Sequence, residues 1–556
     1  MRLVVTRLRS LLIPCTLALI FGTLLFQTDR ALMKGGEKQR LFTSTTPQST
    51  ATNSQTKISG STFKTASSNT TPAANAFFAP IISAGKSVNL SSASPGATLN
   101  YTITIGNSGT TATTGVLFSD TIDANTTLVP GSVNTSPLAL TDSYACTGNV
   151  GISVPAASGV LINDFDPDGT IPAIVGVNTA GTQGTVSLNP GNGSFTFNPA
   201  PGFEGTTTFS YTLSDGVFSD IGTVSITVSG MIWFIDDSVA GPGDGRLSAP
   251  FNSVANFNSL AADDPGDNIF VYSGSYSGAT TLLNNQKLIG QGATASLVSL
   301  AGLTLPPFSN ALPATAGTRP TITNSATVLT LGQGNLIRGF NVTNSAGVGI
   351  SGNNFGTLAA SEISVTSTTC SAAVNLTNGN PTASFTSISA NNCTNGIILD
   401  TLNAAGSFTI TGTGTAGSGG TIQNTTGGDS LTGAAGIRMN SVSNVSFNRM
   451  QINDHSNYGI RGNSVTNMTL ADSVLNGNNG TSTSSAFREG ALSIVNLLGS
   501  CSFTNTNFSG GSMHTMYIEN TGGTLNRLTV DTCTVASTRA GSDDAFQFRP
   551  SAGTPT

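Results

Sequence analysis

A spacing of 23 residues between similar apolar side chains is the feature of this sequence that most restricts how the chain can fold. Val342, Val365 and Ile388 follow one another at that interval. Further pairs at 23 residues are Val374 and Ile397, Leu376 and Leu399, Val445 and Met468, Phe447 and Leu470, and Ile452 and Leu475, and the interval widens to 27 at Cys501 and Leu528, Phe503 and Val530, and Phe508 and Val535. A fixed period in this range is typical of a solenoid, because one repeat buries its apolar side chains only against the next.

The coils of this solenoid are predicted to be built of strands. Within each period the apolar residues have strand spacing and form no helical stripe, which excludes helical repeats and leucine-rich repeats. One turn phrase recurs in three versions: NSAGVGISGN (344–353), NNCTNGIILD (391–400) and NDHSNYGIRGN (453–463). Asn and Gly accept the left-handed backbone of a tight corner, so the phrase is predicted to be a coil corner at which Asn side chains form ladders.

The composition agrees with an all-β fold and excludes one class of partner. Only 9% of the 556 residues are charged, 65 are Gly, and aromatic residues make up 6%, a mixture suited to short strands and many turns. The net charge is -6 and the sequence pI is about 4.9. Nucleic-acid binding needs clustered Lys and Arg, so no nucleic-acid partner is expected.

The segment MIWFIDDSVAGPGDGRLSAPFNSVANF (231–257) resembles the opening of right-handed parallel β-helix proteins of the pectin-lyase-like group. The resemblance implies a right-handed parallel β-helix over residues 231–556. The last stretch, DDAFQFRPSAGTPT, still reads as a coil strand at Phe546 and Phe548, with nothing like a cap after it. The β-helix is therefore expected to be incomplete at its C-terminus.

Two immunoglobulin-like β-sandwiches are predicted before the β-helix. In ASPGATLNYTITIGNSGTTATTGVLFSDTI (93–122), Leu99, Tyr101, Ile103 and Ile105 alternate with polar residues, as in a half-buried strand. The phrase resembles a repeat domain of unknown function found in bacterial surface proteins, and the domain is predicted over residues 80–140.

The second sandwich is predicted over residues 141–230. An N-P-G-N-G turn separates the alternating stretches around Val186 and Phe195, which is a strong hairpin signal. The block from VLINDFDPDG to GTVSITVSG is similar to the cadherin-like tandem repeats of large bacterial adhesins.

The N-terminal residues predict export. Arg2, Arg7 and Arg9 precede an apolar run from Leu11 to Phe26, which is the composition of a signal peptide; without a clear cleavage site, an uncleaved anchor over residues 1–30 stays open. The Ser/Thr-rich residues 31–79 are too poor in large apolar side chains to fold and are predicted to be a disordered linker. The expected location is secreted or at a bacterial cell surface, with membrane contact only through an uncleaved N-terminal segment.

The segment NDFDPDG places Asp164, Asp166 and Asp168 on alternate residues, with Gly169 to turn the chain. Hard oxygen ligands at this spacing are able to bind Ca²⁺ in a structural role, and an Asp-rich turn without metal is the alternative. A second acidic segment contains Asp236, Asp237 and Asp244, where ordinary Asp-Gly turn chemistry is the stronger interpretation.

Two of the five cysteines after the signal segment, Cys370 and Cys393, are one period apart and should lie on adjacent coils. Coils stack at about 4.8 Å, within the Cα range of a disulfide. A disulfide and a ladder of buried thiols are both consistent with the spacing.

No catalytic constellation stands out. Asp543 and Asp544 faintly resemble the G-D-D element of polygalacturonases, but neighbouring residues of a strand point to opposite faces. A calcium-dependent lyase would need a carboxylate cluster with a basic residue, and no acidic cluster surrounds the scattered Arg338, Arg438, Arg449 and Arg461. His455 and His514 are predicted to be solvated residues of corner loops.

Two functions follow from these patterns. The first is a non-catalytic, adhesin-like surface protein whose β-helix binds extracellular glycans or cell-surface proteins. The second is a polysaccharide lyase or glycoside hydrolase of the pectin-lyase-like fold, and the lack of catalytic clusters favours the first.

Overall fold

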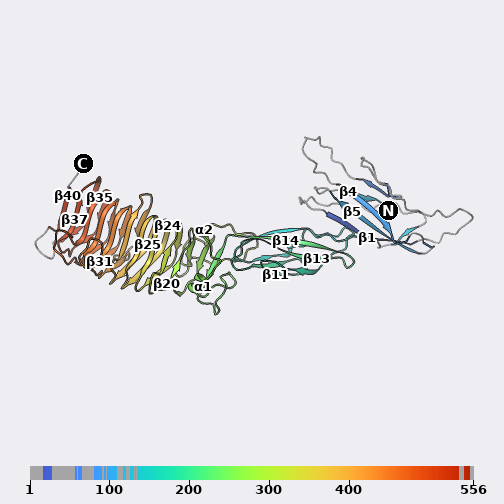
Figure 1. Cartoon of the computed structure of the whole chain (residues 1–556), viewed down its shortest axis with the longest axis horizontal. Helices are drawn as coiled ribbons and strands as arrows, with labels where there is room; N and C mark the ends of the chain where they lie inside the picture. The colour runs from blue at the N-terminus through green and yellow to red at the C-terminus, as the bar shows by residue number, and fades with distance from the viewer. Residues whose placement is uncertain are drawn as a thin grey trace, which may run out of the picture. The chain divides into compact units, whose positions relative to one another are not determined.

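A computed structural model of the chain describes residues 17–27, 57–58, 61–64, 81–90, 93–94, 97–108, 117–119, 126–129, 132, 134–536 and 544–550. These residues are almost entirely strands and turns (Figure 1), with two five-residue α-helices, α1 (Val254–Asn258) and α2 (Leu297–Ala301), and one 3-10 turn, η1 (Ala156–Ser158). The predicted all-β fold class is confirmed. Within the described ranges, no helix is long and apolar enough to cross a bilayer.

The chain divides into two compact units. One comprises Met1–Tyr144, Ser153–Thr196 and Thr206–Ile226, and the other Ala145–Ile152, Phe197–Gly205 and Thr227–Thr556.

The N-terminal strands form two antiparallel sheets. One has the order β4 (Ile82–Val88), β5 (Thr98–Asn107), β1 (Leu17–Gln27) and β7 (Thr127–Leu128). The other joins β2 (Lys57–Ile58), β3 (Ser61–Lys64) and β6 (Leu117–Ser119). The alternation in β5 is as predicted, with Ile103 and Ile105 buried.

Strands β1, β2 and β3 lie before residue 80, where the sequence predicted a signal segment and a disordered linker. They contain β-branched and apolar residues that favour extended backbone, and they pair with strands of the predicted 80–140 domain. The rest of residues 1–79 lies outside the described ranges.

The second sandwich also has two sheets. One has the order β10 (Ala173–Asn178), β13 (Gly205–Ser214), β14 (Ser219–Ser229) and β8 (Asp142–Thr147), and the other β11 (Gly184–Leu188), β12 (Phe195–Pro199) and β9 (Ile152–Val154). The predicted hairpin is therefore formed by β11 and β12. Phe195 and Phe209 are buried in an edge-to-face contact, with ring centroids 5.5 Å apart.

Strands β15 to β40 form one continuous ladder of parallel pairs, the β-helix (Figure 1). Its strands are β15 (Ile232–Ile235), β16 (Asn268–Val271), β17 (Ser275–Ser277), β18 (Thr280–Thr281), β19 (Lys287–Gly290), β20 (Thr321–Asn324), β21 (Leu329–Leu331), β22 (Asn335–Arg338), β23 (Asn341–Asn344), β24 (Val348–Thr368), β25 (Ala372–Asn391), β26 (Ile397–Leu402), β27 (Ser407–Ile410), β28 (Gly420–Gln423), β29 (Ala435–Ser443), β30 (Val445–Asn448), β31 (Met450–His455), β32 (Tyr458–Thr466), β33 (Thr469–Ala471), β34 (Val474–Asn479), β35 (Gly490–Thr504), β36 (Asn507–Phe508), β37 (His514–Asn520), β38 (Leu525–Asp531), β39 (Thr534–Val535) and β40 (Phe546–Pro550).

The predicted register of the coils is confirmed. Val342 pairs with Val365, and Val365 pairs with Ile388; all three are buried. At the wider interval, Phe503 pairs with Val530. The interior is continuous from coil to coil, because each inward side chain contacts its neighbours above and below.

The long strand β24 bends at two corners and so contributes to three outer faces of the β-helix. We name them by its residues: face 1 contains residues 350–353, face 2 contains 358–361, and face 3 contains 364–367. Strands that pair with these segments in other coils belong to the same face.

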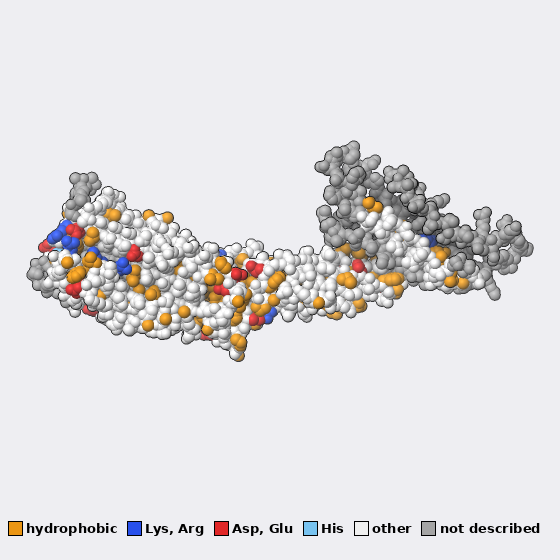
Figure 2. Space-filling model, viewed as in Figure 1, with side chains coloured by type: hydrophobic (Ala, Val, Ile, Leu, Met, Phe, Trp, Pro, Cys, Tyr) orange, Lys and Arg blue, Asp and Glu red, His pale blue; other side chains and the backbone are white. Residues whose placement is uncertain are grey.

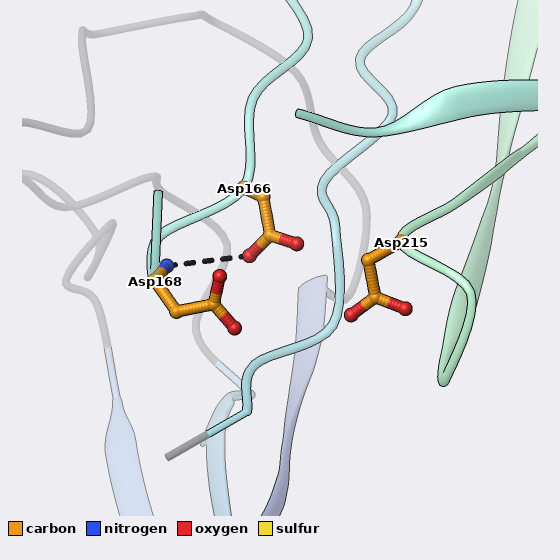
Figure 3. A group of neighbouring side chains, drawn as sticks. All are labelled: Asp166, Asp168 and Asp215. Atoms are coloured by element: carbon orange, nitrogen blue, oxygen red, sulfur yellow. Dashed lines mark hydrogen bonds between the residues drawn. The ribbon is translucent and has the colours of Figure 1, made fainter. Parts of the chain in front are cut away.

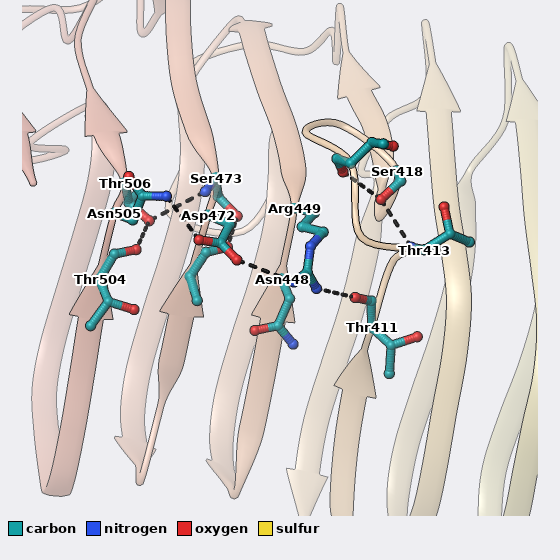
Figure 4. A network of polar contacts seen from close by, with 12 residues as sticks. Thr411, Thr413, Ser418, Asn448, Arg449, Asp472, Ser473, Thr504, Asn505 and Thr506 are labelled. Atoms are coloured by element: carbon teal, nitrogen blue, oxygen red, sulfur yellow. Dashed lines mark hydrogen bonds and ion pairs between the residues drawn. The ribbon is translucent and has the colours of Figure 1, made fainter. Parts of the chain in front are cut away.

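The corners carry the predicted polar ladders. Between faces 2 and 3, Arg449, Asp472 and Asn505 all have positive φ, at 57°, 50° and 45°. Asn505 donates its side-chain amide to the Asp472 carboxylate at 2.9 Å, and Arg449 lies 3.4 Å from the same carboxylate (Figure 4). At another corner, Asn467 donates to the Asn444 side chain at 3.0 Å.

The recurring turn phrase is a coil corner, as predicted. Asn392 and Asp454, from two versions of the phrase, adopt φ of 55° and 61°. Asn and Asp accept this conformation more readily than other residues with a Cβ, which explains why these residue types recur.

Cys370 and Cys393 form a disulfide between adjacent coils, with Cα atoms 4.3 Å apart. Of the two interpretations of their spacing, the disulfide is the one observed. Cys146 and Cys501 are buried thiols, and Cys533 is partly buried.

Candidate functional site

A group of three carboxylates lies in the second sandwich. Asp166 and Asp168 belong to a turn closed by Gly169, whose φ is 89°, and Asp215 comes from the tight turn between β13 and β14. One carboxylate oxygen of each lies within 4.8 Å of the others. Figure 3 shows the three carboxyl groups facing a common space.

Asp166 is the buried member of this acidic group, at 8% exposed. Its Oδ1 accepts hydrogen bonds from the Thr135 hydroxyl at 2.7 Å and from the Asp168 backbone N–H at 3.3 Å. Its Oδ2 is buried and has no hydrogen-bond partner among the described residues. Burial is the main reason that the pKa of Asp166 is raised. A buried oxygen without a donor fits the position of a cation ligand.

Asp168 is held as a carboxylate by its neighbours. Its Oδ1 accepts from the Thr170 N–H and hydroxyl at 2.9 and 2.6 Å, and its Oδ2 accepts from the Thr135 N–H at 2.9 Å. Burial alone would raise its pKa, but these hydrogen bonds outweigh burial and the pKa of Asp168 is lowered. Asp215 accepts from the backbone N–H groups of Val217 and Phe218 through Oδ1, each at 2.6 Å.

Asp164, the third residue of the predicted set, is not in this group. Its Oδ1 accepts from the Leu140 N–H at 2.8 Å and its Oδ2 from the Tyr211 hydroxyl at 2.7 Å. Burial raises the pKa of Asp164 to about 6. Burial, followed by the charge of Asp164, raises the pKa of neighbouring Asp142 to about 7. Asp142 is buried and Asp164 is partly buried, and the two form a coupled carboxylate pair in the second sandwich.

The structure therefore splits the three predicted aspartates and adds Asp215. Successive residues of the NDFDPDG segment diverge because the backbone turns at Asp166, so alternate spacing does not bring all three side chains together. The sequence around Asp215 reads as an ordinary Asp-Gly turn, and no local signal connects it to Asp166.

The second acidic segment does not form a group. Asp237 accepts from the Ser275 N–H at 2.7 Å, Asp236 accepts from Ser238, and Asp244 forms an ion pair with Arg246 at 2.6 Å. This agrees with the interpretation as turn chemistry.

Four ion pairs between described residues join coils on the outside of the β-helix. Figure 2 shows few charged side chains over the middle coils and more of them toward the two ends of the β-helix. The ion pairs are Arg338 with Glu362 (2.6 Å), Arg438 with Asp400 (3.3 Å), Arg449 with Asp472 (3.4 Å) and Arg488 with Glu519 (2.6 Å). Each pair joins neighbouring coils, which gives these charges a structural role.

Arg461 differs from these four because it forms no ion pair with a described residue. It lies on face 1 in register with Arg438 and Ser493, donates to the Ser493 hydroxyl at 3.1 Å, and contacts the Tyr458 ring. Burial is the main reason that its pKa is lowered.

The prediction that both histidines are solvated is wrong. His455 is 2% exposed and His514 is 3% exposed, and both lie in strands. The Thr425 hydroxyl lies 2.8 Å from His455 Nδ1, and burial lowers the pKa of His455 to about 3. The His455 ring packs against the backbone of Gly436, where no side chain stands in its way.

The faint polygalacturonase-like pair is only partly described. Asp543 lies outside the described residues. Asp544 precedes β40, and its carboxylate accepts from the Gln547 amide at 3.4 Å.

Comparisons with known proteins agree with these folds. Residues 134–230 match the family model of the bacterial cadherin-like domain, close to the predicted 141–230. No curated protein matches the sequence.

Three similar solved structures are carbohydrate-active enzymes. An endo-fucoidan hydrolase of glycoside hydrolase family 107 is 14% identical, with 36% of this chain and 28% of that chain covered and a TM-score of 0.16. The A-module of a mannuronan C-5 epimerase from Azotobacter vinelandii is 11% identical (49% and 91% covered, TM-score 0.18). The catalytic domain of a family 87 α-1,3-glucanase is 10% identical (73% and 89% covered, TM-score 0.27). The chain thus contains a bacterial cadherin-like domain at residues 134–230, followed in sequence by a parallel β-helix.

Proposed function

We propose that this protein is a non-catalytic, adhesin-like protein, secreted or held at a bacterial cell surface, whose β-helix binds extracellular glycans or cell-surface proteins. The observation that carries the proposal is the pairing of charges between coils. Glu362, Asp400, Asp472 and Glu519 are each bound to an arginine of a neighbouring coil, which gives these four carboxylates a structural role and does not leave them as the free pair that a hydrolase needs.

Location at the cell exterior rests on three features. Bacterial cadherin-like domains occur in extracellular proteins. The Cys370–Cys393 disulfide is stable in an oxidising compartment. The basic and apolar N-terminal residues have the composition of an export signal or anchor. Fractionation of cells that express the full chain, with N-terminal sequencing of the exported form, tests location and cleavage together; retention in the cytoplasm would contradict the proposal.

Adhesion itself is tested with the exported chain. Immobilised protein is expected to retain bacterial cells or soluble glycans above the level of a surface coated with an unrelated secreted protein. Absence of binding to cells, glycans and surface proteins alike would refute the adhesin function.

A polysaccharide lyase is the second candidate, and Arg461 is the observation that favours it. The Arg461 guanidinium is partly buried on face 1 and forms no ion pair with a described residue, so it is suited to bind the carboxylate of a uronic acid. The test is release of unsaturated sugar from polyuronides, with and without Ca²⁺. Turnover that disappears in Arg461→Ala but survives in Arg438→Ala would establish the enzyme and displace the first proposal.

We also propose that Asp166, Asp168 and Asp215 hold a structural Ca²⁺. The acceptor-only oxygens and the unpartnered Asp166 Oδ2 support this assignment. The two positive charges of the ion would offset most of the repulsion among three neighbouring carboxylates. It would thereby fasten the segment around Thr135, which both Asp166 and Asp168 contact, to the second sandwich.

A further inference from the structure

Face 2 of the β-helix contains a hollow of about 350 Å³. Four strands form its floor: β22, β24, β25 and β27. Its side chains come from successive coils in strict register. Arg338 pairs with Ser361, Ser361 with Ser384, and Ser384 with Thr409. Thr382 and Ser407 form part of the parallel row beside them.

Five hydroxyl groups line this groove: those of Ser361, Thr382, Ser384, Ser407 and Thr409. None of these hydroxyls forms a hydrogen bond with a described residue. Each is both a donor and an acceptor, and the rows repeat at the strand spacing of about 4.8 Å, so three coils present a floor of hydroxyl groups roughly 10 Å long. Arg338 continues this row on a fourth coil.

The groove is close to electrically neutral. Arg338 is the one charged residue in its lining, and its guanidinium Nε donates to Glu362 at 2.6 Å. Glu362 in turn accepts from the N–H and hydroxyl of Thr294. This anchored ion pair fixes one end of the groove and leaves no free charge to attract a polyanion. Leu336 adds an apolar wall at the same end.

We infer that this groove on face 2 binds a short segment of a neutral polysaccharide. The inference rests on the proposed glycan-binding function and specifies the site and the class of glycan. Sugar hydroxyls would exchange hydrogen bonds with the five protein hydroxyls, and a C–H face of the sugar would contact Leu336. Neutral sugars match the groove because a carboxylated or sulfated chain would lose hydration without gaining a free cation.

The test uses the full chain and soluble glycans, with binding measured by affinity electrophoresis and calorimetry. The probes are neutral glucans, mannans and galactans beside alginate and polygalacturonate. Ser384→Arg places a long side chain at the centre of the floor, and a loss of affinity of at least tenfold for the bound neutral glycan is expected. Thr366→Arg, an outward threonine of β24 on face 3, is the matched control and should bind like the wild type. Thr382→Arg repeats the test if Ser384→Arg unfolds at a lower temperature than the control.

Equal loss of binding in Ser384→Arg and Thr366→Arg, or no loss in either, would refute the groove on face 2 as the binding site. Glycan binding at another place on the protein would still be consistent with that result. Binding of polyanions alone would overturn the neutral specificity. Failure of the wild type to bind any glycan would overturn the proposed glycan function itself, and the inference with it.

Discussion

Calcium binding by the second sandwich is expected to depend on single side chains, and Asp166 is the one whose role is clearest. Asp166→Asn keeps an acceptor for Thr135 but removes the charge. We expect wild-type protein to unfold at a higher temperature in Ca²⁺ than in chelator, because a ligand at 100 times its Kd stabilises by about 2.7 kcal/mol. Asp166→Asn should lose this difference in differential scanning fluorimetry.

Asp220→Asn is the matched control for this experiment. Asp220 accepts from the Ala139 N–H at 2.9 Å, outside the acidic group, and Asn keeps that acceptor. The control should retain the response to Ca²⁺. A wild-type protein that unfolds at one temperature in Ca²⁺ and in chelator would contradict the metal site.

The Asp142–Asp164 carboxylate pair makes stability depend on pH. Asp142 has a pKa near 7 in the folded protein, above its value of 3.8 without burial. The folded state therefore binds more protons than the unfolded state. The stability that protonated Asp142 contributes is fully present below about pH 4 and is lost as the pH rises through 7. At pH 8 the free energy of unfolding of Asp142→Asn is expected to exceed that of the wild type by about 1–3 kcal/mol. At pH 4 the two proteins should differ little in this free energy. A wild-type unfolding temperature that rises between pH 5 and pH 8 would contradict this assignment.

The stability of the β-helix depends on the residues at its corners as well as on the pairing of its strands. Asn467 has φ of 55°, donates to Asn444 and accepts from the Ser500 N–H at 3.0 Å. Asn467→Gly should cost about 1 kcal/mol through lost hydrogen bonds. Asn467→Val should cost about 1–2 kcal/mol more, because a β-branched residue resists positive φ. Asn463→Val, in β32 just before this corner, also loses a side-chain hydrogen bond, to Asn440 at 2.9 Å, but its φ is not positive. It should therefore cost no more than about 1 kcal/mol in denaturant unfolding.

The disulfide is expected to stabilise the middle coils. Closing a loop of this length removes about 3 kcal/mol of unfolded-state entropy. We expect the double variant Cys370→Ser, Cys393→Ser to unfold at lower denaturant concentration, whereas Cys501→Ser, which removes a single buried thiol, should lose less. Equal losses in the two variants would show that packing, and not the covalent bond, is responsible.

The sequence predicts the β-helix well because its information is periodic. A repeated interval fixes which residues pair, and the pairs of Val342, Val365 and Ile388 follow directly. Sites assembled from distant segments leave no such trace. Asp215 joins Asp166 only because two turns meet, and His455 is buried because it packs against Gly436, a distant residue in the sequence. The groove on face 2 is invisible in the sequence, since serine and threonine occur on every outer face.

The whole molecule is expected to unfold in two steps, one for each compact unit. Phe408 stacks between Phe385 and Phe447, with ring centroids 5.3 and 6.1 Å away, in the β-helix interior. Phe408→Ala should destabilise the β-helix by about 3–5 kcal/mol. In calorimetry the unfolding step of the unit that contains the β-helix should move to a lower temperature. The Ca²⁺-sensitive step of the unit that contains Asp166 should keep its temperature. Leu431→Ala, at an exposed loop position, is the control and should move neither step.

The chain leaves its coil path at residues 411–419, 424–434 and 480–489 and then resumes pairing in register, so that Ile397 still pairs with Ile437. The register of each coil thus does not depend on how many residues connect it to the next coil. These three loops can therefore be lengthened, exchanged or randomised, in evolution or by design, while the strands of the β-helix keep their register. New binding specificities can be acquired there without any change to the framework.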